Sequence, residues 1–142
     1  MKRWLSLCLF GLAALAQAAD FDYHLTATPV AREVYAFIGK TEDFDTINGG
    51  NIVNTGFIVG PQGVIVIDSG PSLRYGQQMR AAIAKITDQP IALVINTHLH
   101  PDHFLGNQAF ADAPIGALAD TREGIVRDGN VFAENLYRMS GD

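Results

Sequence analysis

The stretch Thr97-His98-Leu99-His100-Pro101-Asp102-His103 contains three of the four histidines in this 142-residue chain. It directly follows residues 91–95, an apolar run that predicts a buried strand. Side chains at the end of such a strand are held by a rigid scaffold and can reach into a cleft. In an extended chain, His98, His100 and Asp102 would project to one side. The sequence therefore predicts a cluster of polar side chains at one edge of a sheet.

The residue types in this cluster are those that bind metal ions. Pro101 disfavours helical geometry at His100, and His103 would approach the same pocket as the chain turns into the next helix. Imidazole and carboxylate groups are ligands of zinc, and also of iron and manganese. The alternative for this cluster is a polar loop with surface histidines. We adopt that interpretation only for the isolated His24. The sequence has no His-Glu-x-x-His helix and no Gly-x-Ser-x-Gly elbow.

The surrounding residues predict strands that first pair as a hairpin and then alternate with helices. Strands are expected at residues 34–38, 52–59, 64–67, 91–95 and 115–118, with a turn of about four residues at 60–63. Helices are expected at 71–87 and 104–111, with a polar turn over 96–103. After Asp120 the pattern is helical but is broken by Gly124 and Gly129. This order predicts a layered α/β domain.

The amino-terminal residues have the pattern of a secretion signal. Lys2 and Arg3 precede an apolar run over residues 5–16, which is too short to span a bilayer but fits a signal-peptide core. The small residues Ala16 and Ala18 predict cleavage after Ala18. The alternative, an amphipathic or core helix, would require a polar face that this run lacks. We therefore expect a signal peptide over 1–18, one domain over 19–142, and a periplasmic or secreted protein with no stable membrane anchor.

The composition excludes several other classes of protein. Ten basic residues against fifteen acidic ones give a net charge of −5, so no nucleic-acid partner is expected. A hydrophobic content of 48% argues against a disordered chain. The single cysteine, Cys8, excludes an internal disulfide and a cysteine-only zinc site.

The stretch from Thr97 to His103 resembles the His-x-His-x-Asp-His signature of the metallo-β-lactamase superfamily. The resemblance extends to Asp68-Ser69-Gly70 before it and to Gly106-Asn107 after it. It implies the amino-terminal half of an αββα sandwich, which is a mixed sheet with flanking helices. It also implies a zinc-dependent hydrolase of a small-molecule substrate, in which a metal-activated hydroxide attacks an ester, thioester, lactam or similar bond.

The same resemblance implies a role for each polar residue. His98 and His100 would bind a first zinc ion, and Asp102 and His103 a second one. Asp102 would also be catalytic, because it would orient the attacking water. Asp68 would brace the histidine loop, residues 97–103, from behind the ligands, as metal-binding imidazoles generally require. Iron or manganese could replace zinc in such a site.

A narrower similarity connects the chain to the quinoprotein relay system zinc metallohydrolases. It is carried by Thr41-Glu42-Asp43-Phe44, by residues 48–55 and by Asn135-Leu136-Tyr137-Arg138-Met139. It implies a link to the periplasmic oxidation of alcohols by quinoproteins.

The sequence departs from the superfamily pattern after the histidine cluster. Superfamily members draw further metal ligands from the later half of the domain, but no histidine follows His103 here. We therefore expect this chain to be an amino-terminal fragment that carries half of the site and is inactive alone. The alternative is a naturally short, non-catalytic domain that binds a metal or a partner.

Overall fold

The computed structural model describes residues 21–141, and the predicted signal peptide lies outside the described residues. Six strands form one sheet in the order β1-β2-β3-β4-β5-β6. The strands are β1 (Thr28–Ala31), β2 (Val34–Phe37), β3 (Thr55–Gly60), β4 (Gly63–Ile67), β5 (Ile91–Ile95) and β6 (Ile115–Gly116). The helices are α1 (Leu73–Ala84), α2 (Pro101–Phe104), the 3-10 helix η1 (Leu105–Phe110) and α3 (Ala119–Ser140). Strands β1 to β4 are antiparallel, whereas β5 and β6 continue the sheet in parallel, so the mixed sheet and the α/β class are confirmed.

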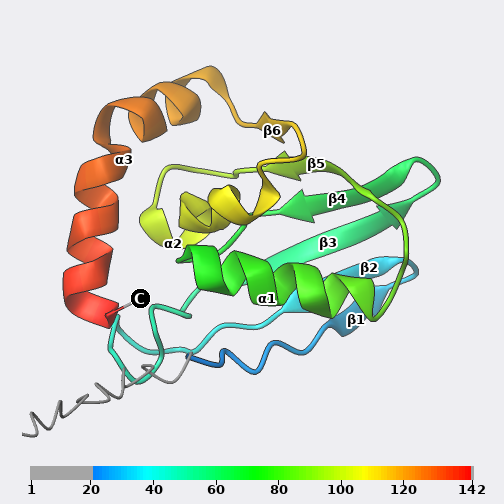
Figure 1. The fold of residues 1–142 in the computed structure, drawn as a ribbon, viewed down its shortest axis with the longest axis horizontal. Helices are drawn as coiled ribbons and strands as arrows, with labels where there is room; N and C mark the ends of the chain where they lie inside the picture. The colour runs from blue at the N-terminus through cyan, green and yellow to red at the C-terminus, as the bar shows by residue number, and fades with distance from the viewer. Residues whose placement is uncertain (1–20, 142) are drawn as a thin grey trace, which may run out of the picture.

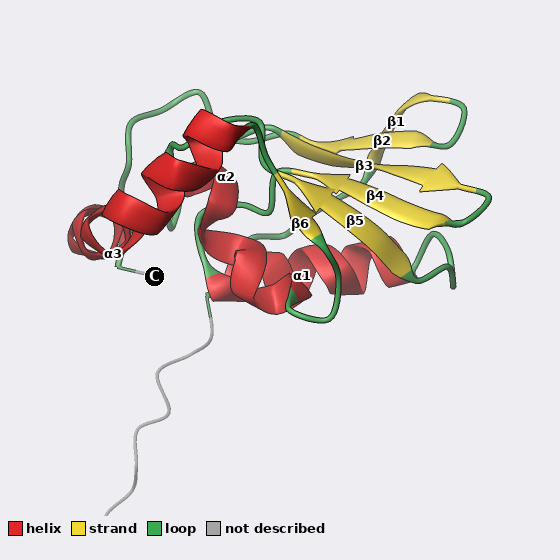
Figure 2. Ribbon diagram, turned by 90° about the horizontal axis from the view of Figure 1, so that it is seen from above, coloured by secondary structure: helices red, strands yellow, loops and turns green. Residues whose placement is uncertain are grey.

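Helix α1 lies along one face of the sheet (Figure 2). Ser72 caps the helix, since its side chain accepts a hydrogen bond from the N–H of Tyr75 at 3.1 Å. The core between α1 and the sheet is closed by side chains that are at most 2% exposed, among them Phe57, Val66 and Met79. Their burial supplies most of the driving force that orders β4 and its neighbours.

No helix of the described chain lies along the opposite face of the sheet (Figure 2). Strand pairing places Ile58, Ile65 and Leu93 in one row across this face, and Ile67 and Ile95 in another. Ile58 is 37% exposed and the other four side chains are half-buried. Unbroken apolar runs such as residues 64–67 and 91–95 are typical of strands that are covered on both faces, whereas the described chain covers only one face.

Helix α3 stands at the end of the sheet, beside α2 (Figure 1). The sequence predicted that Gly124 and Gly129 break this helix, which is wrong, because it runs without interruption from Ala119 to Ser140. A Cβ at Gly124 would lie 3.1 Å from Cδ2 of Leu99, so this glycine allows the helix to approach the histidine loop closely. Within residues 21–141, no helix has both the length and the apolar character needed to cross a membrane.

Several predicted boundaries are corrected by the structure. The strand expected at 52–59 begins only at Thr55, and Gly60 pairs with Gly63, which leaves two residues in the turn instead of about four. Helix α1 is shorter at both ends than the predicted 71–87, and β6 stops at Gly116 rather than at residue 118. The short strand β1 was not predicted, because all four of its residues are exposed and lack an apolar pattern.

Candidate metal centre

The candidate residues lie where two parallel strands end. Ile67 of β4 pairs with Ile95 of β5, so the segments that follow both strands leave the sheet at the same edge, next to α2 (Figure 1). Asp68 follows directly, and its N–H donates to the carbonyl of Ile95 at 2.8 Å. Asp68 has a φ of 56°, a left-handed conformation that is uncommon outside glycine. Such a conformation at a polar strand end is typical of functional sites.

The carboxylate of Asp68 is the centre of the hydrogen bonds in this region, with a side chain only 3% exposed. Oδ1 accepts from the N–H of Thr97 at 2.8 Å. Oδ2 accepts from the hydroxyl of Thr97 and from Nδ1 of His103, both at 2.8 Å. Asp68 therefore holds both ends of the segment from Thr97 to His103.

These bonds determine which nitrogen of two imidazoles carries the proton. The single hydroxyl proton of Thr97 is donated to Asp68, so Oγ1 of Thr97 accepts the Nδ1–H of His98 at 2.9 Å. Nδ1 of His103 likewise donates its proton to Asp68. In both neutral rings Nε2 is therefore left with a lone pair, which is the form that binds a metal ion.

Asp102 and His103 project from the first turn of α2. The sequence placed them in a polar turn, with Asp102 on extended chain, and this was wrong: the helix begins at Pro101, a residue favoured at the first helical position. His100 stays extended, with φ −71° and ψ 139°, as expected before a proline. The extended alternation therefore ends at His100, and Asp102 and His103 come from a helix.

The facing atoms of Asp102 and His103 fit a shared cation. Oδ2 of Asp102 lies 3.6 Å from Nε2 of His103, and the two side chains are only 10% and 18% exposed. Both atoms are electron-rich when Nδ1 of His103 carries the proton. Two bonds of about 2.0–2.2 Å to one tetrahedral ion would place their donor atoms about 3.4 Å apart, which is close to the observed separation. This pair therefore fits a metal ion.

His98 completes a cluster of three imidazoles. Its ring centroid lies 4.7 Å from that of His100 and 3.9 Å from that of His103. Burial, followed by the proximity of the other two histidines, lowers the pKa of His98 below 6.5. The neutral form, which can bind a metal, is therefore favoured. Within the described chain, no three or more His, Cys, Asp or Glu side chains are placed to hold one ion, so the four-residue ligand set remains a prediction.

Sequence reasoning missed Thr97 as a functional residue. Its hydroxyl connects Asp68 to His98 and thereby sets the tautomer of that ring. The available signal was a hydroxyl residue directly before the first histidine. Its role becomes apparent only in the folded chain, where Oγ1 of Thr97 lies 2.8 Å from Oδ2 of Asp68, a residue 29 positions earlier.

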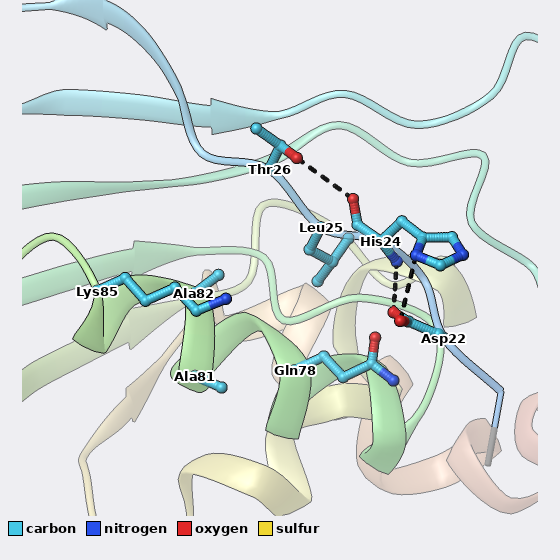
Figure 3. A pocket seen from close by; sticks show the side chains of 8 residues that line it. All are labelled: Asp22, His24, Leu25, Thr26, Gln78, Ala81, Ala82 and Lys85. Atoms are coloured by element: carbon cyan, nitrogen blue, oxygen red, sulfur yellow. Dashed lines mark hydrogen bonds and ion pairs between the residues drawn. The ribbon is translucent and has the colours of Figure 1, made fainter.

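The cavity in Figure 3 is not part of this centre. It has a volume of about 610 Å³ between the amino-terminal segment and α1, and none of the five candidate residues lines it. His24 does, with a side chain that is 84% exposed and 3.2 Å from Asp22. His24 is thus a surface histidine, as its isolation in the sequence indicated.

Comparison with known proteins identifies the family. The profile of the metallo-beta-lactamase superfamily matches residues 48–119, just over half of the 142 residues. The chain belongs to the metallo-beta-lactamase superfamily. Among curated proteins, a linear primary-alkylsulfatase from Pseudomonas sp. is 42% identical over an alignment of 92 residues that covers 59% of this chain and 17% of the sulfatase. The chain thus spans less than a fifth of that relative.

Solved metallo-beta-lactamases share the fold. A motif mutant of the Cronobacter sakazakii enzyme has a TM-score of 0.57 at 23% identity, covering 74% of this chain and 39% of its own. The Pseudomonas aeruginosa enzyme FIM-1, solved in a mono-zinc form, has a TM-score of 0.59 at 19% identity and covers 74% and 46%. A Pontibacter korlensis enzyme gives 0.59 at 18% identity, with 74% and 48% covered. The shared fold therefore corresponds to less than half of the chain of each of these enzymes.

Proposed function

We propose that this protein is a zinc-dependent hydrolase whose metal centre includes His98, His100, Asp102 and His103. The observation that carries the proposal is the pair of hydrogen-bonded connections from Asp68. One goes directly to His103 and the other passes through Thr97 to His98, and both leave Nε2 free for a metal. A polar surface loop would not require two rings to be held in the same tautomer by one buried carboxylate.

Each residue has a specific task in this proposal. His98 and His100 would hold one ion, and Asp102 and His103 a second. Zinc, when bound, lowers the pKa of water and polarises the bond under attack. Asp68 keeps the imidazoles oriented, and Asp102 would also orient the attacking water. Iron or manganese fit the same nitrogen and oxygen donors.

The substrate class is proposed to be an ester in the wide sense. The linear primary-alkylsulfatase, the relative at 42% identity, supports a sulfate ester. The fold shared with metallo-beta-lactamases leaves a lactam or thioester as the other candidates. The test is an assay of the longest product that the gene encodes against an alkyl sulfate, a carboxylic ester, a thioester and a β-lactam. Turnover that chelation abolishes and zinc restores supports the proposal. Turnover that persists in EDTA contradicts it.

Export and a role in quinoprotein oxidation belong to the same proposal. The signal pattern over residues 1–18 and the similarity of residues 48–55 to the quinoprotein relay system metallohydrolases support it. Mass spectrometry of periplasmic protein should find a chain that starts at Ala19 or Asp20. Intact Met1 in a soluble exported product would contradict export.

A second candidate function is a non-catalytic domain that binds a metal or a partner. It is favoured by the finding that no three ligands surround one point within residues 21–141. The same assays distinguish the two: zinc binding without turnover, in the longest gene product, would favour the binding domain.

A further inference from the structure

A pair of asparagines lies directly behind the candidate centre. Asn96 is the first residue after β5 and is 3% exposed, and Asn107 is half-buried in η1. Nδ2 of Asn107 donates to Oδ1 of Asn96 at 2.8 Å, and Nδ2 of Asn96 donates to Oδ1 of Asn107 at 3.1 Å. The two side-chain amides therefore form a reciprocal pair that joins the end of a strand to the helix after the histidine loop.

This amide pair is connected to the backbone of His103. The second proton on Nδ2 of Asn96 points to the carbonyl of His103 at 3.4 Å, and the N–H of Ser69 donates to the same carbonyl at 2.8 Å. The hydroxyl of Ser69, a fully buried residue, donates to Oδ1 of Asn107 at 2.8 Å. Ser69 and Asn96, from two different segments, therefore both donate to this one carbonyl, and Asn107 is bonded to both of them.

The network has one consistent orientation of its amides. If the Asn96 amide were turned over, its oxygen would face the carbonyl oxygen of His103, and two acceptors would oppose each other. Asn107 must then present its oxygen to Nδ2 of Asn96. A buried network in which every member has a partner is rigid and specifies one arrangement.

His103 needs such support because its own helix is too short to hold it. Helix α2 has four residues, about one turn, and a single turn is not stable alone. Asp68 fixes the ring of His103 through Nδ1, whereas Ser69 and Asn96 fix its carbonyl. Gly106 allows this approach, since a Cβ there would lie 2.0 Å from the carbonyl oxygen of Ser69.

From this geometry we propose that Asn96 and Asn107 are positioning residues that set the place of His103 relative to Asp102. The proposal rests on the proposed metal-dependent function and deepens it. Neither asparagine is a metal ligand: they act through the backbone of His103, and their loss moves Nε2 of that ring away from the metal position. Partners of metal ligands typically change metal affinity by about 10–100-fold when removed.

The test compares variants of the full chain. Asn107→Leu removes the amide at similar volume. The double variant Asn96→Leu/Asn107→Leu removes both amides. It should preserve the fold better than the single variant, because no buried amide is left without its partner. Thr55→Val is the matched control: it removes a buried hydroxyl bonded to Tyr75 at 2.9 Å, and it belongs to the core beneath α1.

Two measurements are made on each variant. The first is the ¹⁵N and proton signal of the His103 ring in metal-free protein, and the second is zinc affinity by calorimetry. We expect the asparagine variants to shift or broaden the Nδ1–H signal of His103 and to weaken zinc binding about 10–100-fold. The Thr55→Val control should lower thermal stability and change neither readout.

The outcomes separate this proposal from the function on which it rests. Unchanged His103 signals in both asparagine variants, with a stability loss like that of the control, would show that the pair serves the fold alone and would overturn the proposal. A changed His103 signal in a protein that binds no zinc even as wild type would support the positioning role and contradict the metal-dependent function.

Discussion

Nδ1 of His103 lies 2.8 Å from Oδ2 of Asp68, across 35 residues of sequence. This contact brings the end of β4 to the first turn of α2. Together with the hydroxyl of Thr97, it allows one carboxylate to orient the imidazoles of His98 and His103. Asp68 is only 2% exposed, so the negative charge is sheltered from water and its hydrogen bonds are correspondingly strong. These bonds leave Nε2 of His98 and His103 with a lone pair, which is the form that the proposed metal centre requires.

Asp68→Asn should weaken zinc binding by about 10–100-fold, because the amide cannot accept all three donors. Asparagine tolerates the left-handed backbone at this position, so the substitution adds little strain. Calorimetric zinc titration measures the effect. Asp112→Asn, which removes an exposed ion pair with Arg80, is the control and should leave the affinity unchanged. Equal affinities in the two variants would refute the role of Asp68.

Gly106→Ala should lower the free energy of unfolding by about 2–3 kcal/mol, as expected for overpacking against backbone. A Cβ at this position would lie 2.0 Å from the carbonyl oxygen of Ser69. Gly116→Ala is the matched control, because its Cβ would meet its nearest neighbour at 3.8 Å, and it should change stability by less than about 0.5 kcal/mol. Chemical denaturation compares the two, and similar losses would contradict the close packing at Gly106.

His98 should titrate below pH 6.5 in the folded, metal-free protein. Burial and the neighbouring histidines disfavour its charged form, so the unfolded chain binds this proton more readily. The stabilising contribution is therefore complete above pH 6.5 and is lost as the pH falls from 6.5 through the lowered pKa. Histidine NMR signals followed against pH give the value directly. A His98 pKa above 6.5 would show that the nearby carboxylates outweigh burial and the other two rings.

Much of the fold could be predicted from local patterns. Residues 91–95 form β5 with the expected bounds, because an unbroken apolar run between turn residues has few alternatives. The parallel pairing of β4 and β5 agrees with the helix predicted between them, because parallel neighbours need a long crossover connection. Helix α3 was predicted less well, since Gly124 weakens the local pattern and its packing partner, Leu99, is distant in sequence.

The candidate centre could be located from sequence, but its internal order could not. Three histidines and an aspartate within six residues indicated a metal site without any structure. The tautomers of His98 and His103 depend on Asp68, and only the folded chain brings that carboxylate to them. The start of α2 at Pro101 was also missed, because proline before a ligand fits a turn and a first helical residue equally well.

The uncovered face of the sheet should bind hydrophobic dyes in this 142-residue chain. Ile58→Thr and Ile65→Thr alter neighbouring side chains in one row across that face, and each should reduce dye fluorescence. Val126→Thr is the control: this residue is 77% exposed on α3, away from the sheet, and its loss should leave the fluorescence unchanged. A chain that is dye-silent from the start would show that the face is covered.

Calorimetric titration with zinc of wild type, His98→Asn/His103→Asn and His24→Asn tests the central claim most directly. Each variant replaces histidine by a neutral side chain, and asparagine tolerates the φ of 51° at His24. At pH 7 we predict a binding heat in wild type that EDTA abolishes. The same heat should persist in His24→Asn and disappear in the double variant. The same heat in all three proteins would contradict a metal centre at the histidine cluster.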